Sequence, residues 1–370
     1  MKAMRIITTV CWLVTGFVLT GLAVWFLTGT VFGFQVETRG FRLPFSLGFG
    51  GWDSVTGAYE LAGAYGEPAA GINSLEIDWI SGMVTVMPHD GADISITEYS
   101  RRELRDDETL RFDRSGGTLK IWFRERGAAG NIVIGNVPSK QLEVLVPRAL
   151  YKDLSAFTVD SVSARVIADG LGAGVCKVKT TSGGISLSNV SSGNFKADST
   201  SGTITVTSVS AETMDLHSTS GAIHVNGSSA GSLDCNTSSG GIIVDGAFGY
   251  TKLHSSSGRL SLNNTASGST LNASTVSGSH DLSGAFDAAV VSSSSGRVSF
   301  TSAVVPSSLK ASSSSGNIDI TVPGGAPVTV RHSSSSGRFS SDVAVIMHNS
   351  PDAQFNLSAT SGNVRILELG

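Results

Sequence analysis

A serine followed by glycine recurs about every 19 residues through the second half of the chain, and this period limits the possible folds more than any other feature. The glycines stand at positions 183, 202, 221, 240, 258, 278, 296, 316, 337 and 362, with successive spacings of 19, 19, 19, 18, 20, 18, 20, 21 and 25. A fixed period of this kind indicates a solenoid, in which each repeat is one unit that packs on its neighbours.

Apolar residues flank each glycine at strand spacing. Around Gly221 they are Met214 and Leu216 before it and Ile223 and Val225 after it. A spacing of two places side chains on one face of a strand. Small hydroxyl residues such as Ser218 and Ser220 stand three and one before the glycine, so we expect positions −7, −5, −3, −1, +2 and +4 to face inward. The alternation shifts by one residue at the glycine, which predicts a bend where glycine adopts an unusual φ angle.

Each repeat is therefore predicted to contain two short strands joined at the Ser-Gly bend, followed by a polar loop such as residues 189–193 or 227–231. One such unit cannot bury its own apolar face, whereas units stacked about 4.8 Å apart share a continuous core. The predicted fold is an all-β, β-helix-like solenoid of 19–20-residue repeats over residues 73–370, with regular repeats over 160–370. His280 departs from the pattern, because it occupies a +2 position that is otherwise apolar.

The N-terminal region has a different character. Ile6 to Leu27 runs 22 residues without a charge, which is the length of a membrane-spanning helix. Lys2 and Arg5 precede this run, so residues 1–5 are expected to form a cytoplasmic N-terminus. We expect a transmembrane anchor at 6–28, a linker or cap at 29–72, and a single-pass cell-membrane protein with an extracytoplasmic solenoid. The alternative is a cleaved signal peptide, whose apolar region would be shorter.

Composition excludes several classes of function. The net charge is −4 and only 15% of residues are charged, so a nucleic-acid partner is not expected. The three cysteines, Cys11, Cys176 and Cys235, form neither a disulfide framework nor a zinc motif, and no cofactor or metal is expected. Cys176 and Cys235 occupy inward positions three repeats apart, so we expect buried free thiols.

One outward-facing column carries the candidate site. Arg259, Arg297 and Arg338 follow the glycine directly in alternate repeats, and Asp281 and Asp319 stand at +3 in the repeats between them. Opposite charges on neighbouring rungs form a structural ladder, and this interpretation explains the column. The functional interpretation is a surface that binds an anionic or sugar polymer through the arginines. No catalytic set of residues is recognisable, and the two aspartates are predicted to lie too far apart for a glycosidase pair.

The chain resembles a family of bacterial membrane-anchored envelope proteins called "putative adhesins", formerly a domain of unknown function. The resemblance covers residues 73–370 and rests on the run Leu142 to Pro147 and on Thr181-Ser182-Gly183-Gly184-Ile185 with its successors. It implies a β-solenoid tethered to a membrane, and some members are similar to accessory proteins of envelope-stress systems. It implies no catalytic residues.

These observations favour a non-enzymatic cell-envelope protein whose rigid surface serves adhesion or binding to an envelope polymer or protein. Two alternatives stay open. One is an accessory or regulatory protein of an envelope-stress signalling system, and the other is a carbohydrate-active β-helix enzyme. The enzyme is disfavoured because residues 180–370 contain only 19 charged residues, whereas such enzymes cluster carboxylates with cations on one face.

Overall fold

A computed structural model describes residues 59–123, 138–325, 327–347 and 354–370. The expected anchor at 6–28 and most of the expected linker at 29–72 lie outside these residues. The described residues belong to one compact unit, residues 55–370. Within the described ranges, no helix is long and apolar enough to cross a membrane.

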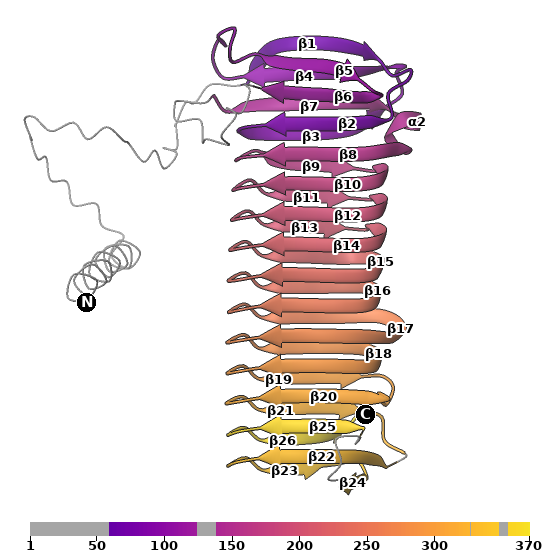
Figure 1. Ribbon diagram of the computed structural model, residues 1–370, viewed down its shortest axis with the longest axis vertical. Helices are drawn as coiled ribbons and strands as arrows, with labels where there is room; N and C mark the ends of the chain where they lie inside the picture. The colour runs from indigo at the N-terminus through magenta and orange to yellow at the C-terminus, as the bar shows by residue number, and fades with distance from the viewer. Residues whose placement is uncertain (1–58, 124–137, 326, 348–353) are drawn as a thin grey trace, which may run out of the picture. The chain divides into compact units, whose positions relative to one another are not determined.

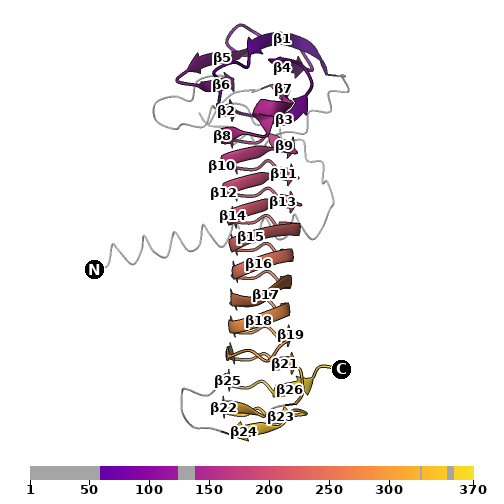
Figure 2. The same ribbon diagram turned by 90° about the vertical axis from the view of Figure 1, so that its right-hand side faces the viewer.

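The unit is a β-solenoid, as the repeat predicts, and its strands form one continuous 26-stranded sheet that coils into two facing layers (Figures 1 and 2). We call the layer of strands before each bend sheet 1 and the layer after each bend sheet 2. Sheet 1 begins with β8 (Leu154–Ser161), β10 (Gly172–Thr180), β12 (Ser191–Ser199) and β14 (Ser210–Ser218). Sheet 2 begins with β9 (Arg165–Asp169), β11 (Ile185–Ser188) and β13 (Ile204–Thr207). Neighbouring rungs pair in parallel and in register, so equivalent residues stack.

In the middle of the stack the polar loop expected after each pair of strands is replaced by continuous strand. The strands β15 (Ile223–Thr237), β16 (Ile242–Ser255), β17 (Leu260–Thr275) and β18 (His280–Ser293) each run from sheet 2 of one rung into sheet 1 of the next. The expectation of a loop at 227–231 is therefore wrong, because β15 continues through it with only a shift of register between Val225 and Ser228. The stack continues with β19 (Val298–Ser302), β20 (Ser308–Ser313) and β21 (Ile318–Val322).

The core between the two sheets follows the predicted pattern with one correction. Residues at −7, −5, +2 and +4 are buried, for example Phe195, Ala197, Ile204 and Val206 around Gly202. The hydroxyl residue at −3 is also buried, but the serine at −1 is exposed, as at Ser201. At Gly202 the two residues before the glycine, at −2 and −1, are exposed, and the glycine itself is buried.

A side-chain hydrogen bond closes most bends. The backbone N–H of the glycine donates to the hydroxyl oxygen three residues earlier, as Gly202 does to Ser199 at 2.8 Å. The same bond, at 2.8–3.1 Å, recurs at Thr180, Ser218, Thr237, Ser255, Ser293, Ser313 and Ser334, and the Ala164 N–H donates in the same way to Ser161 Oγ. The hydroxyl thus satisfies a buried donor that neither sheet can pair.

The repeat glycines are required for space, and the expectation of an unusual φ at the bend is wrong for them. A Cβ placed on any of the ten glycines would lie 1.8–2.1 Å from a carbonyl oxygen of the neighbouring rung. Positive φ angles occur instead six residues after the bend, at Gly170, Asn189, Ser208 and Gly227. Those four positions turn the chain from sheet 2 back toward sheet 1 in the early rungs.

A cap covers the N-terminal end. It contains β1 (Glu60–Pro68), β2 (Ser74–Trp79), β3 (Gly82–His89), β4 (Asp93–Ser100), β5 (Leu110–Ser115), β6 (Thr118–Phe123), β7 (Lys140–Pro147) and the short helix α2 (Arg148–Tyr151). β2 and β3 form a rung of the solenoid, and β6 and β7 stack on its outer side in parallel. β4, β1 and β5 then add antiparallel strands that end the stack.

The C-terminal end departs from chain order. After β21 come β22 (Val328–Ser334), β23 (Phe339–Ser341) and β24 (Val345–Met347), and the last strands are β25 (Phe355–Ala359) and β26 (Val364–Glu368). β25 pairs with both β20 and β22, and β26 pairs with both β21 and β23. The last rung of the chain is therefore inserted between the two rungs that precede it (Figures 1 and 2). A stack in simple chain order, which the repeat suggests, is wrong here.

Candidate functional site

The outer face of sheet 1 carries polar and charged columns, because outward residues at −6 and −4 stack from rung to rung. In the cap and the first rungs several charges of these columns are paired with a neighbouring rung. Ion pairs join Lys120 to Glu76 at 2.7 Å, Lys196 to Asp215 at 2.9 Å, and Lys252 to Asp234 at 2.7 Å. His217 Nε2 also lies 2.6 Å from Asp215. Exposed ladders of this kind keep neighbouring rungs in register and contribute little net free energy.

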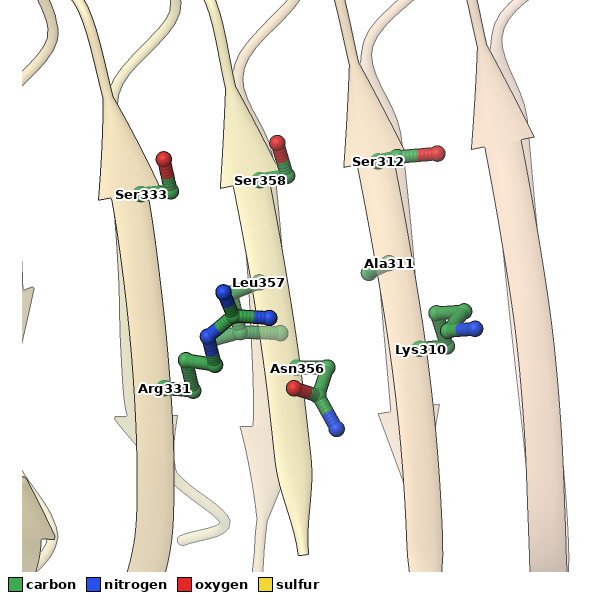
Figure 3. Close-up of a pocket in the computed structure, with 8 residues that line it drawn as sticks. All are labelled: Lys310, Ala311, Ser312, Arg331, Ser333, Asn356, Leu357 and Ser358. Carbon is green, nitrogen blue, oxygen red and sulfur yellow. The ribbon is translucent and has the colours of Figure 1, made fainter. Parts of the chain in front are cut away.

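The same columns change character in the last three rungs. Lys310 of β20, Asn356 of β25 and Arg331 of β22 are register partners at −6. Ser312, Ser358 and Ser333 are register partners at −4. Figure 3 shows both rows on one outer face, with the Arg331 side chain extending over β25 and the Lys310 ammonium leaning away from it. We call these six residues the terminal groove.

The terminal groove is an open hollow of about 380 Å³, floored by Ala311 and Leu357. Among the described residues, neither Lys310 nor Arg331 forms an ion pair with a carboxylate. Two rungs separate these cations, so their backbones lie about 10 Å apart. The groove therefore offers two positive groups, one amide and three hydroxyls, a set suited to anionic groups and to sugar hydroxyls.

The arginine column predicted from the repeat lies on sheet 2. Register places Asp281 and Asp319 in one file, separated by Ser299, as expected. Arg297 Nε lies 3.9 Å from Asp319, while the stronger partner of Asp319 is Arg365, with Nε at 2.6 Å. This pair raises the pKa of Arg365, chiefly through the hydrogen bond to Asp319. Around Asp319 the column is therefore an ion-pair ladder.

The spacing of the arginines differs from the prediction. The inserted rung places Asn363 between Asn317 and Arg338, with Asn363 N–H donating to Asn317 Oδ1 at 3.0 Å and Arg338 N–H donating to Asn363 Oδ1 at 2.9 Å. Arg338 thus stands three rungs from Arg297, where alternate rungs were expected. Within the described residues, Arg259, Arg338 and Asp281 form no ion pair, and a binding role for the column stays a prediction.

A second charged cluster lies inside the N-terminal cap. The Lys140 ammonium is fully buried, donates to Glu98 Oε1 and the Glu108 carbonyl, and lies 3.4 Å from the ring centre of Phe123. Arg102 and Arg105 bond the buried Glu108 carboxylate at 2.8 Å and hold its pKa well below the usual range, the Arg102 bond being the main cause. Burial lowers the pKa of Lys140 to about 8. The buried groups Lys140, Glu98 and Glu108 are thus bonded to one another and to Arg102 and Arg105, whose side chains reach the surface.

The described residues contain no group of three histidine, cysteine or acidic side chains that could hold a metal ion. Cys176 and Cys235 are buried and free, as predicted, and burial raises the pKa of Cys176 to about 12. A thiol of this kind is not a nucleophile at neutral pH.

Sequence reasoning missed the terminal groove and Arg365. Lys310, Asn356 and Arg331 all lie six residues before a repeat glycine, so the column itself is readable from the repeat. Arg365 stands three after Gly362, in the same position as Asp319. The sequence does not predict that these residues lie close together, because their proximity depends on the inserted rung.

Comparison with known proteins supports the family resemblance that the repeat indicates. A family model described as Toastrack DUF4097 matches residues 72–288 and 245–367. No curated protein matches the sequence.

Three solved structures show a similarity over most of the chain. A "putative lipid binding protein" from Parabacteroides distasonis has 16% identity and a TM-score of 0.37, covering 84% of this chain and 97% of its own. A "putative adhesin" from Bacteroides fragilis has 12% identity and a TM-score of 0.26, covering 84% and 97%. A "putative cell adhesion protein" from Clostridium sporogenes has 8% identity and a TM-score of 0.23, covering 84% and 100%.

Proposed function

This chain belongs to the Toastrack DUF4097 family, and we propose that it is a non-enzymatic binding protein of the cell envelope that holds acidic polysaccharide in its terminal groove. The observation that carries this proposal is that two cations without a carboxylate partner line one groove. Lys120, Lys196 and Lys252 are each paired with a carboxylate, and Lys177 stands singly between Thr158 and Lys196. Lys310 and Arg331 line the same groove and have no carboxylate partner among the described residues.

The chemistry of the groove favours a carbohydrate over other anions. An arginine guanidinium binds a carboxylate through two parallel hydrogen bonds, and a lysine ammonium adds a second point charge. The hydroxyls of Ser312, Ser358 and Ser333 can both donate to and accept from sugar hydroxyls. The outward-facing side chains of the groove are polar, which favours a hydrophilic ligand over an acyl chain.

The N-terminal sequence supports a location at the membrane. The run Ile6 to Leu27 has the length of a spanning helix, and Lys2 and Arg5 precede it. In this proposal the segment 6–28 anchors the chain in the cell membrane, and the solenoid extends outside the cytoplasm, where it meets envelope polysaccharide.

Retention on immobilised polygalacturonate, a carboxylate polysaccharide, tests the proposal with the full-length protein in detergent. Dextran serves as the neutral control and anionic phospholipid vesicles as the lipid control. We expect retention on polygalacturonate alone, and a loss of at least about tenfold in affinity for Lys310→Ala/Arg331→Ala, the equivalent of about 1.4 kcal/mol. Retention should fall as salt rises, because the groove is exposed.

The matched control is Lys177→Ala/Lys179→Ala, which removes the same net charge from β10 on the outer face of sheet 1. It should bind like the wild type. Equal retention of the two double variants would refute the groove as the site. Retention of the wild type by anionic vesicles but not by polygalacturonate would replace polysaccharide with lipid, and failure of the wild type to bind any of the probes would remove the proposal altogether.

A further inference from the structure

The rung formed by β25 and β26 connects the C-terminal end of the solenoid to the rest. On sheet 1 it is the only described link between β20 and β22, and on sheet 2 it is the only described link between β21 and β23. The remaining described partner of β22 is the three-residue strand β24. The rung of residues 328–341 is thus held to the stack through the inserted rung.

The rung of residues 328–341 also has the features needed to stack on β20 and β21 directly. Gly337 follows Gly316 by 21 residues, close to the spacings of 18–20 in the preceding repeats. Its bend is closed by the usual bond, with Gly337 N–H donating to Ser334 Oγ at 2.8 Å. The inserted rung has Ala359 in place of that hydroxyl. Two segments of the chain are therefore suited to the layer beneath β20 and β21.

The terminal groove exists in only one of these arrangements. With the rung inserted, Asn356 separates Lys310 from Arg331 by two layers, or about 10 Å. Direct stacking of β22 on β20 would make the two cations neighbours about 4.8 Å apart and would remove Asn356 and Ser358 from the face. Like charges directly opposite each other on adjacent strands are unfavourable.

We propose that ligand binding in the terminal groove is coupled to insertion of the C-terminal rung, so that an acidic polysaccharide stabilises the inserted arrangement. This inference rests on the proposed function. A ligand that contacts Lys310, Asn356 and Arg331 together has a higher affinity for the arrangement that presents all three, and it shifts the population by that difference. The coupling is reciprocal, so expulsion of the rung lowers affinity for the ligand.

Hydrogen exchange of residues 355–368 tests the coupling in the full-length protein. We expect polygalacturonate to slow exchange in this segment at least about tenfold, since exchange reports local opening and binding suppresses it. Dextran should leave the rate unchanged.

A variant of the rung that leaves the cations intact supplies the second measurement. Gly362→Val places side-chain atoms against the Gly316 carbonyl oxygen, which already lies 2.0 Å from the position of a Cβ. It should expel the rung and reduce polygalacturonate affinity to that of Lys310→Ala/Arg331→Ala. The matched control, Gly241→Ala, places a Cβ at an ordinary 3.5 Å from the Arg259 carbonyl oxygen and should bind normally.

A disulfide lock keeps the test informative if Gly362→Val does not fold. Thr321 and Leu367 are register partners of β21 and β26 on sheet 2, away from the groove. Oxidised Thr321→Cys/Leu367→Cys should bind at least as tightly as the reduced form and should show no further slowing of exchange with ligand.

The outcomes separate the two proposals. Binding by the wild type with unchanged exchange at 355–368, or normal binding by folded Gly362→Val, would overturn the coupling and leave the groove in place. Absence of binding by the wild type would overturn both.

Discussion

At the scale of single residues, each bend of the solenoid is set by a glycine and a hydroxyl. The glycine is required because the rungs approach so closely that its missing side chain would overlap a carbonyl oxygen of the next rung. The hydroxyl at −3 accepts the glycine N–H, which points into a region with no other acceptor. The two requirements together explain the glycine and the hydroxyl at −3; the exposed serine at −1 has no structural explanation.

Gly240→Val should destabilise the solenoid by about 3 kcal/mol, because a Cβ there would lie 2.1 Å from the Gly221 carbonyl oxygen and the rungs on both sides must move. The adjacent substitution Gly241→Ala should change stability by less than about 0.5 kcal/mol. Urea denaturation midpoints measure both. Equal midpoints for the two variants would contradict the explanation from space.

His280 occupies an inward position of the regular rungs and has no acidic partner among the described residues. Its Nε2 lies 2.8 Å from Thr275 Oγ1, while its Nδ1 is buried without a described partner. Leu260 and Val298 are its neighbours in the adjacent rungs, so no charged group faces it from either. Burial lowers the pKa of His280 to about 4.

The solenoid should therefore lose stability as pH falls. The unfolded chain takes up a proton at His280 near its ordinary pKa of 6.5, whereas the folded chain takes it up only near 4. The contribution is complete above pH 6.5 and is lost between pH 6.5 and 4, amounting to about 3 kcal/mol. Denaturation midpoints across this window should show the loss, and His280→Leu should flatten it. An unchanged slope in His280→Leu would show that another group is responsible.

At the scale of elements, the order of rungs departs from chain order in the same way at both ends of the stack. At the C-terminus the rung of β25 and β26 lies between two earlier rungs. At the N-terminus the rung of β2 and β3 lies between β6–β7 and β8–β9, which follow it in the chain. Each terminal segment is thus paired on both sides, which protects rungs that would otherwise expose a free edge.

The sequence predicts the rungs better than their order. The repeat identifies the inward residues from Cys176 to Ile366, because strand spacing and burial follow the same period. The repeat does not predict which rungs are neighbours in the stack, since every repeat has the same Ser-Gly bend and the same apolar pairs. The long final spacing of 25 residues is the only trace of the insertion. The terminal groove depends on that order, so it too escapes prediction even though Lys310, Asn356 and Arg331 share one position in the repeat.

The buried cluster around Lys140 escapes prediction for a different reason. Charged side chains are usually exposed to solvent, yet Glu108 is fully buried beside Arg102, Arg105 and the Lys140 ammonium. Its partners come from segments that are about 30–40 residues apart, such as Lys140 and Glu98 with a separation of 42. Pairing at this distance follows from the cap's tertiary structure alone.

At the scale of the whole molecule, the solenoid is a stiff support that ends in a polar groove. Its length comes from the regular stacking of rungs, and several of its outer charges are paired between neighbouring rungs. In the proposed function, the groove is the part of this support that contacts the polysaccharide.

The order of the last three rungs is the central claim, because the groove exists only if β25 lies between β20 and β22. Paired cysteines at outward register positions test it through disulfide formation, which needs Cα atoms within about 7 Å. Ser312→Cys/Ser358→Cys should cross-link readily on oxidation, because the two residues are register partners on adjacent strands. Ser312→Cys/Ser333→Cys should not, because two layers separate them by about 10 Å. Cross-linking of 312 to 333 in place of 312 to 358 would show that the rungs stack in chain order, and the groove would then not exist.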